Sequence, residues 1–258
     1  MQYLLRNKIG AILLGLCFSS AVNAQSDEVF QPNHDELPYY FGMSIGLSNN
    51  YLAFNRANRF LPSSYSDPQS IIEINPINNF YYNLGLVGTL RLTKHVLLRA
   101  NPTLLIVGTK NVINFKVKQT PDLSQKLNVS SSIIHLPLAL KFQSDRYNGF
   151  RHASLMRHYL LVGGKFDFDL ASNKASKISS PIGSVVSGSY PSVINGTDMG
   201  AEIGVGLSFY LRYATISPEV KFSYGLKDLH KLSTTYPLMN NLDKVTSNFV
   251  YFTIHIEN

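Results

Sequence analysis

Residues 131–146 read SSIIHLPLALKFQSDR, and this stretch decides the fold. Every second position carries a large apolar side chain: Leu136, Leu138, Leu140 and Phe142. The positions between them are mixed: His135, Pro137, Ala139 and Lys141. An alternation of period two is typical of a β-strand, because successive side chains point to opposite faces. The stretch therefore predicts a strand with one wholly apolar face and one face that carries a lysine.

The same alternation recurs along the chain in eight runs: 39–48, 80–92, 96–108, 131–146, 158–170, 199–212, 215–227 and 249–258. Runs of about ten residues are long enough to cross a bilayer as tilted strands. Long connections alternate with short ones: the long ones are 49–78, 109–128, 171–198 and 228–247, and the short ones are 93–95, 144–157 and the turn near 213. We therefore expect an all-β fold, a closed antiparallel transmembrane β-barrel of about eight strands, with long extracellular loops and short periplasmic turns.

A soluble β-sandwich also alternates, so the composition of the two faces has to decide between the two folds. The row of large apolar side chains on one face is not interrupted by a charged residue in any of the eight runs. Lipid penalises a charge on that face by about 2–4 kcal/mol at mid-depth, whereas water imposes no such penalty. The other face is rich in Gly, Ser, Asn and Thr, which suit the inside of a narrow barrel. These features favour the membrane barrel.

Charged residues of both signs also fall on the polar face, and we expect them to form a lumen network: Arg91, Arg99, Lys141, Lys165, Asp167, Asp169, Glu202, Arg212, Glu219, Lys221 and Glu257. Buried charges must be paired or hydrated. The sequence therefore predicts that Lys141 lies close to Asp167, Asp169 or a neighbouring glutamate.

Two local features complete the expected barrel. Aromatic residues cluster at 39–41, 80–82 and 249–252, which predicts girdles at the membrane interfaces. Proline removes a hydrogen-bond donor from a strand, so we expect β-bulges at Pro102, Pro137 and Pro218.

The N-terminus has the pattern of a secretory signal peptide. Arg6 and Lys8 precede an apolar run over 9–18, and small residues end at Ala24, so cleavage is expected between Ala24 and Gln25. The expected organisation is a signal peptide over 1–24, a short extended periplasmic lead-in over 25–38 and the barrel over 39–258. Cys17 lies in the signal peptide, so the mature chain is expected to lack disulfides and thiol chemistry.

The sequence shows little sign of catalytic, metal or nucleic-acid chemistry. The full chain has a net charge of +7, but its basic residues are scattered, and an exported protein does not meet nucleic acid. We expect no cofactor and no metal, because no ligand spacing or phosphate loop occurs. Asp167 and Asp169 could form an acid/base pair, although a lumen salt bridge fits them better. His152 and Ser154 resemble the pair of outer-membrane lipid A deacylases, but they fall in a predicted periplasmic turn.

Three stretches resemble one family in particular: IIHLPLALKFQSDR (133–146), RHYLLVGGKFDFDLAS (157–172) and YATISPEVKFSYGLKDL (213–229). They are similar to the PorT family of outer-membrane barrels, called SprT in gliding bacteria, and the resemblance covers 39–258. It implies an integral outer-membrane protein that contacts lipid and other components of the type IX secretion system. That system exports proteins with a C-terminal sorting domain and is linked to gliding motility.

The resemblance implies no catalytic residue, so we expect a non-enzymatic protein. Two alternatives remain open: a structural or adhesive surface barrel of OmpX type that acts through its loops, and a lipid A-modifying enzyme.

Overall fold

The structure is a computed structural model, and it describes residues 31–56, 71–117, 125–146, 156–172, 177–179, 195–229 and 242–258. A short 3-10 helix comes first, η1 (Pro32–Asp35). The strands follow in chain order: β1 (Tyr39–Arg56), β2 (Ile71–Pro76), β3 (Asn79–Arg91), β4 (Val96–Ala100), β5 (Thr103–Val117), β6 (Gln125–Gln143), β7 (Met156–Asp169), β8 (Lys177–Ser179), β9 (Thr197–Tyr210), β10 (Thr215–Gly225) and β11 (Leu242–Glu257).

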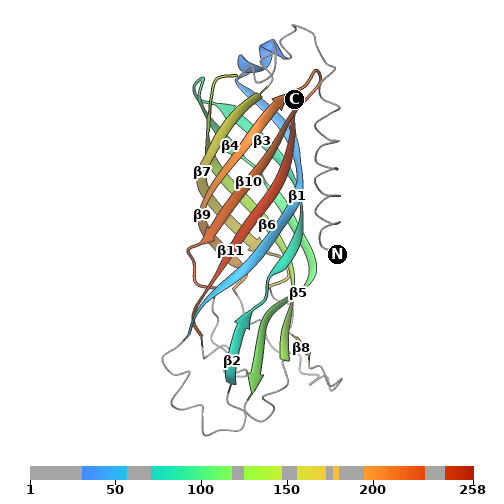
Figure 1. Cartoon of the computed structure of the whole chain (residues 1–258), viewed down its shortest axis with the longest axis vertical. Helices are drawn as coiled ribbons and strands as arrows, with labels where there is room; N and C mark the ends of the chain where they lie inside the picture. The colour runs from blue at the N-terminus through green and yellow to red at the C-terminus, as the bar shows by residue number, and fades with distance from the viewer. Residues whose placement is uncertain are drawn as a thin grey trace, which may run out of the picture.

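The strands form a closed antiparallel barrel (Figure 1). The hydrogen-bonded order is β1-β11-β10-β9-β7-β6, followed by β4 and β5 and then β3, and β1 closes the ring by pairing with β3. β4 and β5 act as one interrupted strand, since both pair with β3 on one side and β6 on the other. Every one of the eight runs predicted from the sequence is a strand of this ring, so the predicted fold is confirmed.

The wall extends further than expected at the end where the long loops lie, which we call the loop end. β1 continues to Arg56, and the hairpin of β5 and β6 projects past the ring. β2 pairs with β5, and β8 pairs with β6 (Figure 1). The prediction that 49–78 and 171–198 are loops throughout is therefore wrong, because parts of both add short strands to the projecting sheet. The opposite end, with the short turns, η1 and the C-terminus, is the turn end.

The expected bulges at the three prolines are wrong. Pro137 pairs with Lys165 and Pro218 pairs with Ile254 in unshifted register. Pro102 lies in the break between β4 and β5, where the main-chain N–H of Asn101 donates to the carbonyl of Pro137 at 3.5 Å. Proline cannot return that bond, because it has no N–H. No extra residue is therefore inserted at the prolines, and Pro137 leaves one ladder bond unmade opposite Asn101, at the break between β4 and β5.

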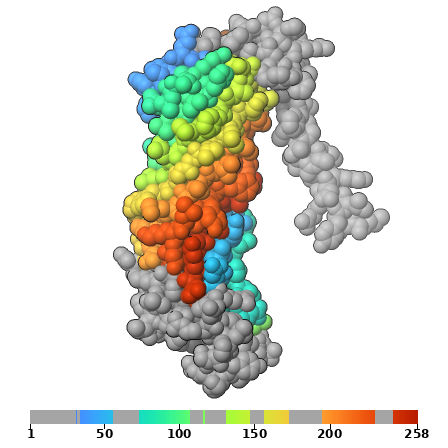
Figure 2. All heavy atoms as spheres, turned by 90° about the vertical axis from the view of Figure 1, so that its left-hand side faces the viewer, coloured from blue at the N-terminus to red at the C-terminus, as the bar shows by residue number. Residues whose placement is uncertain are grey.

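The distribution of burial is that of a membrane barrel. Large apolar side chains on the outer face of the strands are exposed, and the outward members of the 131–146 stretch, Leu136, Leu138, Leu140 and Phe142, are all among them. Charged and polar side chains are buried in the lumen. Figure 2 shows the wall as oblique bands of colour, because the strands are tilted against the long axis. Within the described residues, no helix has the length and apolar character needed to cross a membrane.

Adjacent glycines on β7 offer a matched test of how closely the wall is packed. A Cβ on Gly163 would lie 2.6 Å from the Cα of its partner Ala139, whereas a Cβ on Gly164 would meet nothing nearer than the carbonyl oxygen of Gly200 at 3.6 Å. We expect Gly163→Ala to lower the free energy of unfolding by about 1–3 kcal/mol, because the backbone must shift. Gly164→Ala should leave it nearly unchanged. Urea unfolding in lipid vesicles measures both, and equal losses would contradict this packing.

Candidate functional site

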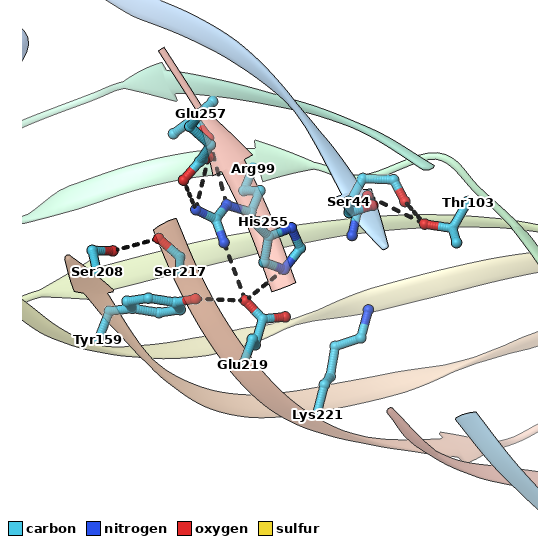
Figure 3. Close-up of polar contacts among 12 residues, drawn as sticks. Ser44, Arg99, Thr103, Tyr159, Ser208, Ser217, Glu219, Lys221, His255 and Glu257 are labelled. Atoms are coloured by element: carbon cyan, nitrogen blue, oxygen red, sulfur yellow. Dashed lines mark hydrogen bonds and ion pairs between the residues drawn. The ribbon is translucent and has the colours of Figure 1, made fainter. Parts of the chain in front are cut away.

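The lumen holds a first buried cluster around Arg99, which we call the Arg99 cluster (Figure 3). The guanidinium of Arg99 contacts Glu219 at 3.1 Å and both carboxylate oxygens of Glu257 at 3.0 Å. Tyr159 donates its hydroxyl to Glu219 at 2.9 Å, and His255 Nε2 lies 3.3 Å from the same oxygen. These side chains come from β4, β7, β10 and β11, so the cluster ties together distant parts of the wall.

A second cluster, the His135 cluster, joins β6, β7, β9 and β10. His135 Nδ1 lies 2.6 Å from Asp167, and its Nε2 lies 3.3 Å from Glu202. Lys165 contacts Asp167 at 2.7 Å, and Lys221 contacts Glu202 at 2.8 Å. Each of these side chains is at most 8% exposed. An unpaired buried charge carries a large free-energy cost, and the pairing of each charge in this cluster offsets that cost.

An apolar layer lies next to the His135 cluster, and we call it the aromatic layer: Tyr81, Leu105, Ile133, Phe249 and Tyr251. Its members are at most 6% exposed, and the Tyr251 ring stacks on His135 at 5.0 Å. The prediction of interfacial girdles at 39–41, 80–82 and 249–252 is therefore wrong for Tyr40, Tyr81, Phe249 and Tyr251, which are all buried. Their side chains fall on the lumen side of the strands, where aromatic bulk fills the barrel.

Lys141 does not have the partner that the sequence predicted. Its ammonium lies 4.2 Å from the centre of the Tyr159 ring, and the side chain is buried. Asp167 is already engaged by His135 and Lys165. No ion pair of Lys141 occurs among the described residues, so its stabilising contact is a cation–π interaction.

Three other residues predicted for the lumen network lie at strand ends. Arg212 is exposed in the turn after β9, and Arg91 ends β3, where it binds main-chain carbonyls. Asp169 ends β7 and accepts hydrogen bonds from Ser131 Oγ at 2.7 Å and the N–H of Ala171 at 2.9 Å. The alternation is right about the face of Arg91 and Asp169, but both end their strands, and Arg212 lies beyond the last residue of β9, where the alternation no longer applies.

Several residues of the two clusters were missed from the sequence: Tyr159, Asp198, His135 and His255. Asp198 contacts Lys165 at 3.0 Å, although the sequence pattern places it in a long connection. The two histidines and Tyr159 lie on the polar face of their strands, so the alternation is the signal that indicates them. The predicted network contains only formally charged residues and therefore omits them.

The lead-in folds onto the turn end, where three arginines hold it. Arg146 and Arg157 both contact the carboxylate of Asp35, at 2.9 and 2.7 Å. Further donors from Arg91 and Arg146 reach three main-chain carbonyls at 2.9–3.1 Å: those of Gln31, His34 and Leu37. We call these three arginines, with Tyr210, the mouth cluster. The expectation of an extended lead-in is wrong over η1, because these contacts wind the chain into a turn.

His34 lies between the mouth cluster and the lumen. Its ring lies 4.5 Å from that of Tyr40 and 5.5 Å from that of Tyr210, both of which are buried. Burial lowers the pKa of His34 to about 4, with Arg146 and Arg91 acting in the same direction and nearby carboxylates opposing them. The ring is therefore neutral at neutral pH and packs as an aromatic side chain.

Neither of the candidate reactive sites gains support from the described geometry. Asp167 and Asp169 bind different partners: His135 and Lys165 contact Asp167, and Ser131 donates to Asp169. No group of three or more potential metal ligands occurs within the described ranges. His152 and Ser154, like the cleavage site at Ala24 and Gln25, lie outside the described residues and stay predictions.

The closed ring, the apolar exterior and the filled polar interior define a small integral β-barrel of the outer membrane. The chain belongs to the family of the outer membrane protein β-barrel domain, which matches residues 23–231. In such barrels the short turns face the periplasm, so the mouth cluster lies at the periplasmic end. The loop end with its projecting sheet is extracellular.

Comparisons with solved structures find other small barrels. The chain is 11% identical to Ail of Yersinia pestis over 86% of this chain and all of that one, with a TM-score of 0.37. It is 10% identical to Neisserial surface protein A over 85% and 97%, with a TM-score of 0.40. OprG of Pseudomonas aeruginosa gives 11% identity over 85% and 94%, with a TM-score of 0.39. These likenesses are too distant to carry a function. No curated protein sequence matches the chain.

Proposed function

We propose that the protein is a non-enzymatic outer-membrane component of type IX protein secretion that acts through its two ends and not through its lumen. The filled lumen carries this proposal. The Arg99 cluster, the His135 cluster and the aromatic layer occupy successive levels of the barrel, and their side chains are almost completely buried. A barrel filled by side chains leaves no diffusion path.

The assignment to type IX secretion comes from the resemblance of residues 133–146, 157–172 and 213–229 to the PorT family. The corresponding strands β6, β7 and β10 carry most of the His135 cluster and part of the Arg99 cluster. The resemblance therefore covers residues that stabilise the barrel interior. The secretion role that the resemblance implies has to be tested in cells.

A deletion strain tests the secretion role. We expect proteins with C-terminal sorting domains to remain inside the cell and disappear from the secretome, and the wild-type gene to restore them. The abundance of unrelated outer-membrane proteins serves as the control for general membrane damage. Normal secretion of sorting-domain cargo in the deletion strain would refute the role.

The projecting sheet favours a second candidate, a surface scaffold that acts through its extracellular hairpin. Asn111 and Asn128 pair across β5 and β6 well beyond the ring. Replacing 112–127 by an Asn-Gly turn would shorten the hairpin at that pair without opening the barrel. Loss of cell adhesion with normal secretion would support this candidate, and unchanged adhesion would count against it.

A further inference from the structure

The mouth cluster binds residues 31–37 in the way that a receptor binds a peptide. Arginines from three separate wall segments converge on the segment, and their acceptors are main-chain carbonyls and the Asp35 carboxylate. The hydroxyl of Thr215 adds a bond to the Gln31 side chain at 3.0 Å. The φ angle of Gln31 is 50°, a left-handed conformation in which a non-glycine residue is strained.

The charges of this site are not balanced by its own segment. Arg146 and Arg157 share a single carboxylate, that of Asp35, while Arg91 donates to main-chain carbonyls. The other acidic residue of the segment, Glu36, is exposed. The side chain of Arg157 is only 5% exposed, yet its Nε and Nη1 have no hydrogen-bond partner in the described part of the chain. A buried guanidinium with unused donors is costly, and a second carboxylate at this place would satisfy it.

We propose that the mouth cluster is a docking site for an acidic, extended segment of a periplasmic protein, and that residues 31–37 occupy it in the free barrel. The incoming segment would place two carboxylates against Arg146 and Arg157, where the chain itself supplies one. This inference goes beyond the proposed secretion role and stands without it, since its test uses the purified protein.

The position of the site favours a protein segment over a lipid headgroup. His34 is 6% exposed and packs against Tyr40 and Tyr210, whose side chains face the lumen. The site therefore lies over the mouth of the barrel, whereas lipid surrounds the outer wall. A peptide can approach along the barrel axis, and guanidiniums pair with its carboxylates through parallel hydrogen bonds.

The test measures binding of a fluorescent oligoglutamate peptide to the folded, mature full-length protein in zwitterionic micelles, with oligoglutamine as the uncharged control. Asp35→Asn weakens the internal competitor. Because residues 31–37 occupy the site in the free barrel, this change should tighten oligoglutamate binding by about tenfold, since the apparent affinity scales with the fraction of open sites. Arg157→Gln should abolish binding, and Arg146→Gln serves in its place if that variant does not fold.

Lys94→Gln is the matched control. Lys94 lies at the same end of the barrel and pairs with Asp145 at 2.8 Å, but both side chains are largely exposed and outside the mouth cluster. Heat-dependent gel mobility establishes that each variant is folded. Affinity unchanged by Asp35→Asn, or weakened equally by Lys94→Gln and Arg157→Gln, would overturn the proposal. Complete displacement of oligoglutamate by phosphatidylglycerol would also overturn it, because the site would then belong to lipid.

Discussion

Replacing Arg99 by methionine is expected to lower the free energy of unfolding of the barrel by about 3–5 kcal/mol, the cost of breaking a buried ion pair by removing one partner. Glu219 and Glu257 are 3% and 1% exposed, so both carboxylates would stay buried without their guanidinium. The chain has no tryptophan. Urea unfolding in lipid vesicles is therefore best followed by circular dichroism and by the mobility shift on unheated gels.

Two variants make the Arg99 result specific. Arg212→Met removes an exposed arginine that lies 6.0 Å over the Tyr213 ring, and it should change the free energy of unfolding by less than about 0.5 kcal/mol. Glu219→Gln combined with Glu257→Gln should restore part of the stability lost in Arg99→Met, because the neutral amides need no counter-charge. Equal losses for Arg99→Met and Arg212→Met would contradict the buried pairing.

Leu138→Arg is expected to lower the free energy of unfolding by about 2–4 kcal/mol, because it places a charge at mid-depth in lipid. Leu138 is 55% exposed on the outer face of β6, midway along the row from Leu136 to Phe142. Vesicle unfolding measures the loss, and it should be smaller in micelles, where water reaches the wall more easily.

Leu170→Arg is the matched control for the lipid face. Leu170 has a comparable exposure, 64%, but it follows the last residue of β7 at the loop end. A charge near the interface costs only about 0–1 kcal/mol. If both substitutions cost the same, the apolar face of β6 does not face the bilayer core.

Because side chains fill the lumen, the two ends of the barrel are the parts that can bind other molecules. At the periplasmic end three arginines hold residues 31–37 over the mouth of the barrel. At the extracellular end β2 and β8 widen a sheet that projects past the ring. Residues at either end can be mutated without changing the Arg99 cluster or the His135 cluster. The proposed docking at the periplasmic end and the proposed adhesion at the extracellular end can therefore be tested separately.

The strand pattern was predictable because a slip of one residue would turn every side chain to the other face. In 131–146 this rule correctly assigned Leu138 to the exterior and Lys141 to the lumen. The rule did not reveal where the strands end: Asp169 is the last residue of β7, and Arg212 lies in the turn beyond β9. It also could not foresee that Phe249 and Tyr251 fill the interior, since aromatic residues suit both a girdle and a packed lumen.

By itself, the sequence determined which side of each strand meets lipid, because period two and the absence of charge on one face leave a single arrangement. Only the tertiary structure decided which lumen residues meet, because partners such as Arg99 and Glu257 come from β4 and β11, and the stagger of the closed ring sets their level. For the same reason Lys141 lies against the ring of Tyr159 instead of a carboxylate. Closure also placed the lead-in over the mouth, where Asp35 meets arginines that are far from it in the chain.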